Sequence, residues 1–291
     1  MTKAAQHQEV VAALKSDGLS NVEIHRKLNK GGHVVSLSVV DRIVRCFTKQ
    51  REREGDPDTL MAHSLSSNTL NNATKFSHHS IQGHHHSIQG VERFADKGKL
   101  RWSMSVGCLL NPNSPAARYG SKAVFKRPVL GCGGLLGHRG STLLVPDLHL
   151  PYQHRDAFSF LGALNDYYKF ERVLCVGDIF DHHRPSFHES ETDALNSEDE
   201  FELAMAHSRK LQGMFPHMVI TIGNHDAIPV RQAQAVGLPL GMLSDFNKVY
   251  GLETTWQWVD QHWFDSWGAY PVVIPMVLGA SDGWDGRILK V

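Results

Sequence analysis

The sequence predicts an α/β fold in which short, buried strands alternate with helices. Three apolar runs carry this prediction, at 142–145, 173–176 and 218–222. Each holds four or five mostly aliphatic residues, which is typical of strands buried on both faces of a parallel sheet. The stretch 155–170 between the first two runs has apolar residues at helical spacing, as a crossover between parallel strands requires. We therefore expect these strands to lie in one sheet.

Each of the three runs leads into a short motif of acidic and histidine residues. The motifs are Asp147-Leu148-His149, Gly177-Asp178-Ile179-Phe180-Asp181 and Gly223-Asn224-His225-Asp226. Residues just past the ends of parallel strands converge at one edge of the sheet, so we expect the motifs to form one site. Carboxylate, imidazole and amide groups are the ligands of hard and borderline divalent cations. The pattern therefore predicts a metal site.

These motifs, in this order and each after a strand, resemble those of the calcineurin-like metallophosphoesterases. The resemblance implies a two-sheet sandwich flanked by helices. It also implies hydrolysis of a phosphodiester or a phosphomonoester by a hydroxide that two metal ions activate. The protein-phosphatase branch has Arg-Gly after the second motif and Glu after Gly-Asn-His. Here His182-His183 and Asp226 stand instead, which favours diesterase or nuclease chemistry.

The motifs that should close the family's domain stand before the other three. Gly83-His84-His85-His86 matches the closing Gly-His-x-His, and His63, after a short apolar run, matches the motif before it. The runs 102–108 and 127–133 resemble the final strands of phage-type members. The strand order is therefore rearranged in the sequence.

In this rearranged order, residues 60–140 resemble the family's later half and residues 141–266 its earlier half. Two explanations stay open: a natural rearrangement resembling a circular permutation, with the Gly-rich segment 137–140 as the new hairpin connection, or a shuffled gene. Neither half has a full ligand set alone. We therefore expect His84 and His86 to lie near Asp147 and Asp178 in one shared site.

The resemblance assigns a role to each matching residue. The first metal would be held by Asp147, His149, Asp178 and His86, and the second by Asp178, Asn224, His63 and His84. Asp178 would bridge, since each of its two oxygens can face one cation. His225 would protonate the leaving oxygen, with Asp226 or Asp181 fixing its tautomer. The alternatives to His63 as this metal ligand are His78, His79 and His262.

The ligand types narrow the choice of metal. A mixed Asp, His and Asn set without thiolate favours manganese, iron, zinc or nickel over a site for magnesium alone, and affinity order does not choose among these four. We expect two divalent ions, with manganese first and iron, zinc or nickel as alternatives. In the loop after the second motif, His182, His183 and His188 either touch substrate phosphate or form a solvated surface. Ser197 and Glu200 predict a capping box for a helix that ends at Met214.

Residues 1–52 predict a small all-α module with three amphipathic helices, and their pattern resembles helix-turn-helix modules. Residues 1–53 hold ten Lys and Arg against five Asp and Glu. DNA binding and protein contact are the two interpretations of this basic module. The charged segment 53–59 predicts a linker, and residues 60–291 the metallophosphoesterase domain.

The whole chain has 30 basic and 30 acidic residues, so no overall charge argues for nucleic acid or an anionic membrane. No apolar run reaches the length of a membrane span, and we expect no membrane partner. Cys46, Cys108, Cys132 and Cys175 form no C-x-x-C pair, which indicates free thiols in a reducing compartment. The expected location is the cytoplasm, that of the host for a phage protein.

A second class of function remains open. The chain would then be a DNA-binding or phage assembly protein whose phosphoesterase domain is a catalytically silent scaffold. The rearranged motif order motivates this alternative, and the amount of tightly held metal distinguishes it from a phosphate-ester hydrolase.

Overall fold

The computed structural model describes residues 27, 57–65, 77–96, 98–121, 127–138, 140–186, 191–266 and 268–288. One compact unit, Thr59–His262 with Ser266–Val291, holds all of the contacts discussed below. The predicted helix-turn-helix module at 1–52 lies outside the described residues apart from Lys27, and its DNA binding stays a prediction.

Within the described residues, the larger sheet has six strands. Its order is β11 (Tyr270–Pro275), β5 (Gly131–Gly137), β6 (Gly140–Val145), β7 (Arg172–Cys175), β8 (Met218–Thr221) and β9 (Trp256–Val259). Strands β6 to β9 pair in parallel, whereas β11 and β5 are antiparallel to their neighbours. The three apolar runs form β6, β7 and β8, so the predicted parallel core of the sheet is confirmed.

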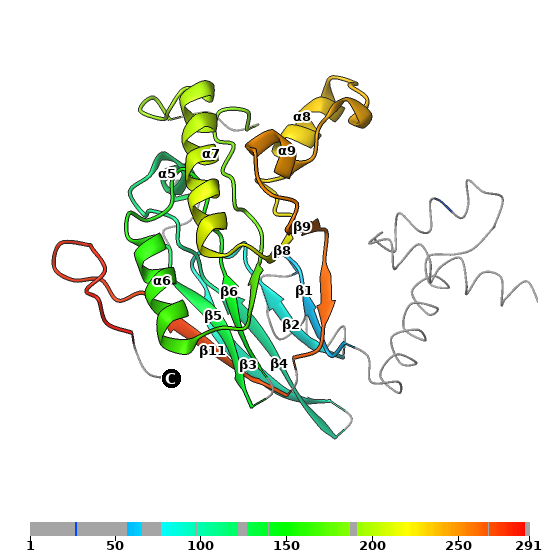
Figure 1. Cartoon of the computed structure of the whole chain (residues 1–291), viewed down its shortest axis with the longest axis vertical. Helices are drawn as coiled ribbons and strands as arrows, with labels where there is room; N and C mark the ends of the chain where they lie inside the picture. Colours follow the sequence, from blue (N-terminus) through cyan, green and yellow to red (C-terminus); the bar gives the residue numbers. More distant parts are fainter. Residues whose placement is uncertain are drawn as a thin grey trace, which may run out of the picture. The chain divides into compact units, whose positions relative to one another are not determined.

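Two long helices cover one face of this sheet (Figure 1). Helix α6 (Ala157–Tyr168) links β6 to β7, and α7 (Ser197–Met214) links β7 to β8. Phe160, Leu161 and Leu164 of α6 are buried in one hydrophobic cluster with residues of β6, β7 and β8. Burial of this apolar stripe explains why the segment is helical here.

The predicted cap of α7 was wrong. Asn196, not Ser197, is the N-cap, and its side-chain oxygen accepts a hydrogen bond from the backbone N–H of Asp199 at 2.9 Å. Glu200 does not turn back to the helix terminus. Its carboxylate accepts from the backbone N–H groups of His183, at 2.6 Å, and Arg184, at 3.1 Å. Glu200 therefore holds the loop after the second motif.

The smaller sheet contains adjacent strands in the order β1 (Thr59–Met61), β2 (His79–Gln82), β4 (Lys99–Val106) and β3 (Gln89–Asp96). The first three are parallel, and β3 is antiparallel to β4. The sequence did not predict β3. Many of its side chains face solvent, so it lacks the apolar run that marks a buried strand.

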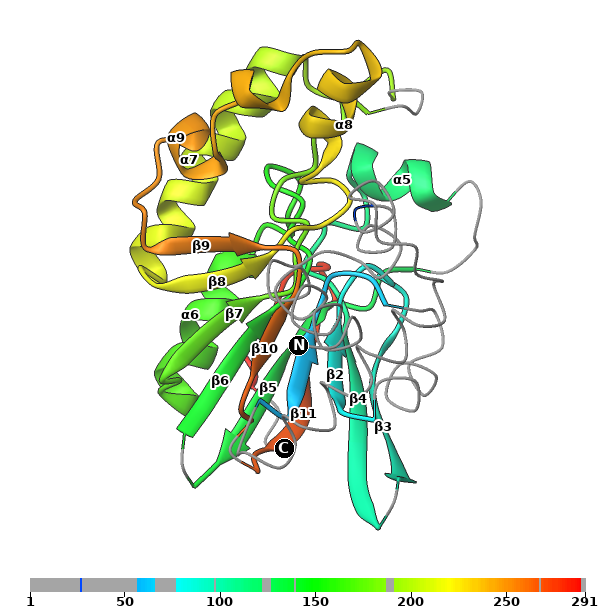
Figure 2. The same cartoon turned by 90° about the vertical axis from the view of Figure 1, so that its right-hand side faces the viewer.

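The two sheets pack face to face (Figure 2). Gly133 of β5 lies against β4: a Cβ atom there would be 2.8 Å from Met104 Sδ and 2.8 Å from Val106 Cγ1. Glycine at this position therefore lets the sheets approach. The predicted fold class, an α/β architecture of two mixed sheets flanked by helices, is confirmed.

The described residues form further short elements. They are α5 (Pro115–Ser121), α8 (Ile228–Ala235), η1 (Leu240–Met242), α9 (Phe246–Tyr250) and β10 (His262–Phe264). Strands β5 and β6 form a hairpin with Gly137 opposite Gly140, as expected for the segment 137–140. The origin of that connection by permutation stays a prediction.

Two further expectations concern the thiols and the membrane. Cys108, Cys132 and Cys175 are buried and free, as predicted, while Cys46 lies outside the described residues. Burial raises the pKa of each of these three thiols. Among the described residues, no helix combines the length and the apolar character that crossing a bilayer requires.

Candidate metal centre

The loops that follow β1, β2, β6, β7 and β8 meet at one edge of the sandwich. Backbone hydrogen bonds join them. Leu148 and His149 both donate to the carbonyl of Asp178, at 3.1 and 2.9 Å, and Gly83 donates to the carbonyl of His63 at 3.0 Å. The predicted motifs from both parts of the chain therefore come together in one place.

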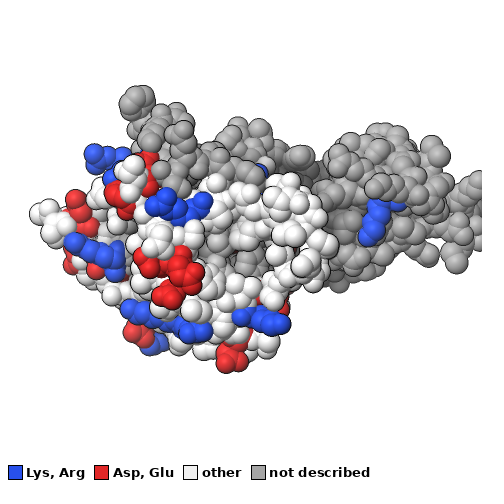
Figure 3. All heavy atoms as spheres, turned by 90° about the horizontal axis from the view of Figure 1, so that it is seen from above, with Lys and Arg blue, Asp and Glu red and all other residues white. Residues whose placement is uncertain are grey.

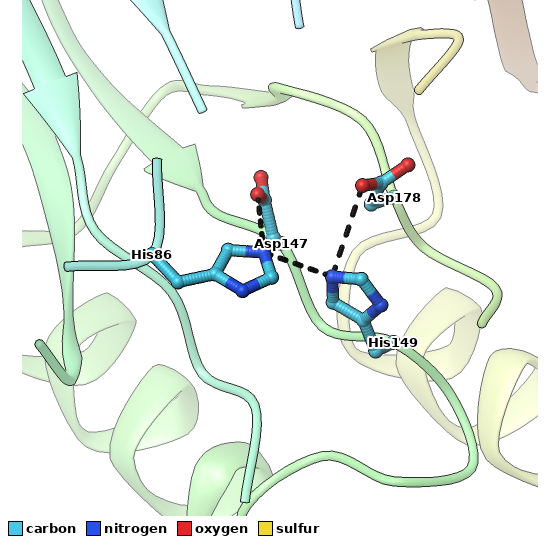
Figure 4. A group of neighbouring side chains, drawn as sticks. All are labelled: His86, Asp147, His149 and Asp178. Atoms are coloured by element: carbon cyan, nitrogen blue, oxygen red, sulfur yellow. Dashed lines mark hydrogen bonds and ion pairs between the residues drawn. The ribbon is translucent and has the colours of Figure 1, made fainter. Parts of the chain in front are cut away.

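The first group of side chains is shown in Figure 4 and contains His86, Asp147, His149 and Asp178. The Nε2 atom of His86 lies 3.1 Å from Asp147 Oδ2 and 3.0 Å from His149 Nε2. His149 Nε2 is 3.7 Å from Asp178 Oδ2. Ligand atoms at roughly 2.1 Å from one shared ion lie about 3–3.6 Å apart, so these spacings fit a cation.

The protonation of His149 also fits a cation. Its Nδ1 lies 2.6 Å from Asp181 Oδ1 and donates its proton there, which leaves the lone pair of Nε2 directed at His86. In addition, Asp147 Oδ1 is buried and has no hydrogen-bond partner among the described residues. An ionisable group near this oxygen is His63, whose Nδ1 lies 3.8 Å away. A buried carboxylate oxygen without a hydrogen bond is costly, and a bound cation would remove that cost.

The second group contains His63, His84 and Asp178, with Asn224 beside them. His63 Nδ1 donates to the carbonyl of Val176 at 2.9 Å. Its Nε2 then faces Asn224 Oδ1 at 2.9 Å and Asp178 Oδ2 at 3.1 Å. Of the candidate histidines, the structure brings His63 to this group, and none of its predicted competitors belongs to any of the candidate metal groups among the described residues.

Asp178 is common to both groups, but it does not use its two oxygens as expected. Oδ2 alone faces both His63 and His149. Oδ1 accepts a hydrogen bond from the backbone N–H of His225 at 2.8 Å, so it is occupied by the third motif. If Asp178 serves both groups, it would therefore do so through a single oxygen, Oδ2.

The backbone at the site is strained. His84, His149 and Asp178 all have left-handed conformations, with φ of 64°, 52° and 45°. Such residues cost on the order of 1–3 kcal/mol each and are concentrated at functional sites. Space is also short: a Cβ at Gly83 would lie 2.2 Å from Asp147 Oδ1, and one at Gly223 would lie 2.0 Å from Asp178 Oδ1.

His225 lies beside the first group, with its ring centroid 4.6 Å from that of His149. Its Nδ1 donates to the backbone carbonyl of Asp181 at 2.7 Å. This contact fixes the tautomer through the main chain of Asp181, whereas the Asp181 carboxylate binds His149. Asp226 has a different place: its two oxygens accept from the backbone N–H groups of Phe180, at 3.0 Å, and Gly223, at 2.9 Å.

The charges at the site are strongly coupled. Burial alone lowers the pKa of His63, but the carboxylates of Asp178 and Asp147 outweigh it and raise that pKa to about 10. Burial likewise opposes the charge of Asp178, yet His63 and His225 hold its pKa well below the usual value. Burial lowers the pKa of His149, and burial together with the Asp178 carboxylate raises that of Asp226 to about 7.

Two of the three loop histidines, His182 and His183, make contacts within the protein, and substrate contact by this loop stays untested. Both ring nitrogens of His182 contact protein, Nδ1 the carbonyl of His225 at 2.9 Å and Nε2 the hydroxyl of Tyr250 at 2.7 Å. His183 is buried, and its Nε2 accepts from the backbone N–H of Glu191 at 3.3 Å. His188 lies outside the described residues. No sequence signal pointed to the Tyr250 contact.

Comparison with known proteins agrees with this geometry. A family model described as calcineurin-like phosphoesterase matches residues 140–285, which is half of the chain. The matched residues include Asp147, His149, Asp178, Asn224 and His225, whereas His63, His84 and His86 precede them. Searches of curated proteins and of solved structures found no match.

Proposed function

The chain belongs to the calcineurin-like phosphoesterases, and from this we propose that it hydrolyses phosphate esters with two divalent cations. The observation that carries the proposal is the pair of ligand groups that share Asp178. We assign His86, Asp147 and His149 to one cation and His63, His84 and Asn224 to the other. When bound, the cation pair supplies Lewis-acid activation of water and of the phosphoryl group.

The residues around the cation positions would organise the reaction. A water oxygen attacks phosphorus, and the bond from phosphorus to the leaving oxygen breaks with its electron pair on that oxygen. His225 donates a proton from Nε2 to the leaving oxygen, because Nδ1 is held by Asp181. The attacking water releases a proton to solvent, and His225 regains one. Asp181 keeps His149 in the tautomer that leaves Nε2 bare.

We propose a phosphodiester as the substrate class, with a phosphomonoester as the alternative. The support is the departure from the phosphatase pattern at His182-His183 and Asp226. Within the described part of the chain, basic and acidic side chains are interspersed on the face seen from above (Figure 3). The proposal therefore names the ester chemistry and no particular polymer.

The first test is hydrolysis together with metal content. With added manganese, the full-length protein is expected to hydrolyse bis-p-nitrophenyl phosphate faster than p-nitrophenyl phosphate. It should hold two equivalents of metal, and removal by a chelator should abolish activity until manganese is restored. A metal-free, inactive protein would instead favour the silent scaffold, and faster monoester hydrolysis would reverse the substrate class. Parallel assays with zinc, iron and nickel would show which metal supports the highest rate of hydrolysis.

A second test uses the protonation of His63. With Nδ1 bonded to Val176, the proton of the imidazolium sits on Nε2, where a cation would bind. Because the metal-free pKa is about 10, a cation must displace this proton at neutral pH. As the pH rises toward that value, the proton competes less strongly with the cation for Nε2 of His63. Metal affinity should therefore rise by up to about tenfold per pH unit between about pH 6 and about pH 9.

This pH dependence can be measured by calorimetric titration with manganese in buffers of different ionisation enthalpy, which also counts the protons released. His63→Asn provides the comparison, since it should bind one cation more weakly and release fewer protons. An affinity that does not change with pH in the wild-type protein would rule out His63 as a ligand.

A further inference from the structure

His182 connects the second motif to the third by its side chain. It has a left-handed backbone conformation, with φ of 50°, which is uncommon for a residue other than glycine. Its Nδ1–H donates to the backbone carbonyl of His225 at 2.9 Å. In the neutral ring, Nε2 accepts the hydroxyl proton of Tyr250 at 2.7 Å. Both nitrogens are used, so this ring has none left for a phosphate.

Tyr250 is well placed to hold the ring of His182. It lies in α9, is 3% exposed, and stacks on Phe180 with ring centroids 3.6 Å apart and an interplanar angle of 8°. The backbone N–H of Phe180 is in turn bound by Asp226. Tyr250 therefore lies against both motifs and is itself fixed by packing.

The main chain of His225 is held at both of its polar groups. Its N–H donates to Asp178 at 2.8 Å. Its carbonyl accepts from His182 at 2.9 Å and from the backbone N–H of Ile228 at 3.0 Å. The contact to Asp178 involves a member of both ligand groups, whereas His182 belongs to neither group. Without the contact from His182, the carbonyl of His225 would keep only the contact from Ile228, and the peptide would lose its support on the side of the second motif. A shift of about 1 Å in a reacting group can cost about 100-fold in rate.

We infer that His182 and Tyr250 are positioning residues, which hold His225 at the distance and angle needed to protonate the leaving oxygen. This inference rests on the proposed function, because it assigns a task in the reaction to two residues that belong to neither ligand group. It also gives α9 a role in the reaction, because Tyr250 of this helix holds His182, which in turn binds the main chain of the third motif.

The test is the dependence of rate on the leaving group. Tyr250→Phe removes one hydroxyl and keeps the stack on Phe180. On diesters with a strongly basic leaving phenol, its kcat should fall about 10-fold, and that of His182→Ala about 100-fold. On p-nitrophenyl diesters, whose leaving group needs little protonation, each variant should lose less than about twofold. Metal content should stay at the wild-type value.

Two comparisons make the result decisive. Tyr168→Phe removes a hydroxyl from a half-buried tyrosine of α6 and should leave the leaving-group dependence unchanged. In His225→Ala, adding Tyr250→Phe should cause no further loss, since the acid it positions is gone. An equal loss on all leaving groups, or none, would overturn the inference while the proposed function stands. A wild-type protein that hydrolyses no ester would refute the proposed function itself.

Discussion

Asp178→Asn is expected to empty both cation positions and to lower phosphodiester hydrolysis by at least about 1,000-fold. A single oxygen, Oδ2, faces His63 Nε2 at 3.1 Å and His149 Nε2 at 3.7 Å. The amide of asparagine has the same shape and can still accept the N–H of His225. It lacks the negative charge that two neighbouring cations require, so the loss reports charge and not packing.

The measurement is metal content by elemental analysis, together with the rate on bis-p-nitrophenyl phosphate. Asp193→Asn is the matched control, since Asp193 pairs with Arg118 at the surface and its side chain is 60% exposed. That variant should keep both metals and the wild-type rate. If Asp178→Asn also kept two equivalents of metal and an undiminished rate, the assignment of the site would be wrong.

Gly223→Ala is expected to cause the second largest loss, of at least about 100-fold in rate. The added Cβ would lie 2.0 Å from Asp178 Oδ1 and 2.3 Å from Asp178 N. One of these atoms is backbone, so rotation of a side chain cannot relieve the clash. The loop must move, and with it the carboxylate that both ligand groups share. Overpacking of this kind also lowers the free energy of unfolding by about 1–3 kcal/mol.

Gly213→Ala separates this effect from a general intolerance of alanine. Gly213 lies in α7, and a Cβ there would have nothing within 4 Å. Alanine is the better helix former, so the variant should gain about 0.5–1 kcal/mol and keep full activity. Urea denaturation and the diesterase rate measure both variants. A Gly223→Ala protein with the wild-type rate and stability would contradict this prediction, because the loop would then accommodate the added Cβ without moving Asp178.

The sequence determined the central strands and the motifs that follow them. The sequence predicts β6, β7 and β8 because strands that are buried on both faces must be apolar along their whole length. β3 was missed because many of its side chains face solvent, and no apolar run remains to mark it. The cap of α7 was missed because Ser197 and Asn196 are both good caps, and only the contact of Glu200 with the loop at 183–184 excludes the first.

The tertiary structure decided how the two parts of the chain meet. His84 and His86 lie about sixty residues before Asp147 and about ninety before Asp178, and no local sequence pattern predicts that they come close together. This proximity arises because the loops after parallel strands gather at one edge, whatever the order of the strands in the chain. The same holds for the single shared oxygen of Asp178 and for the two occupied nitrogens of His182. Residue type determines which contacts a side chain can make, whereas the packed backbone determines which atom makes each one.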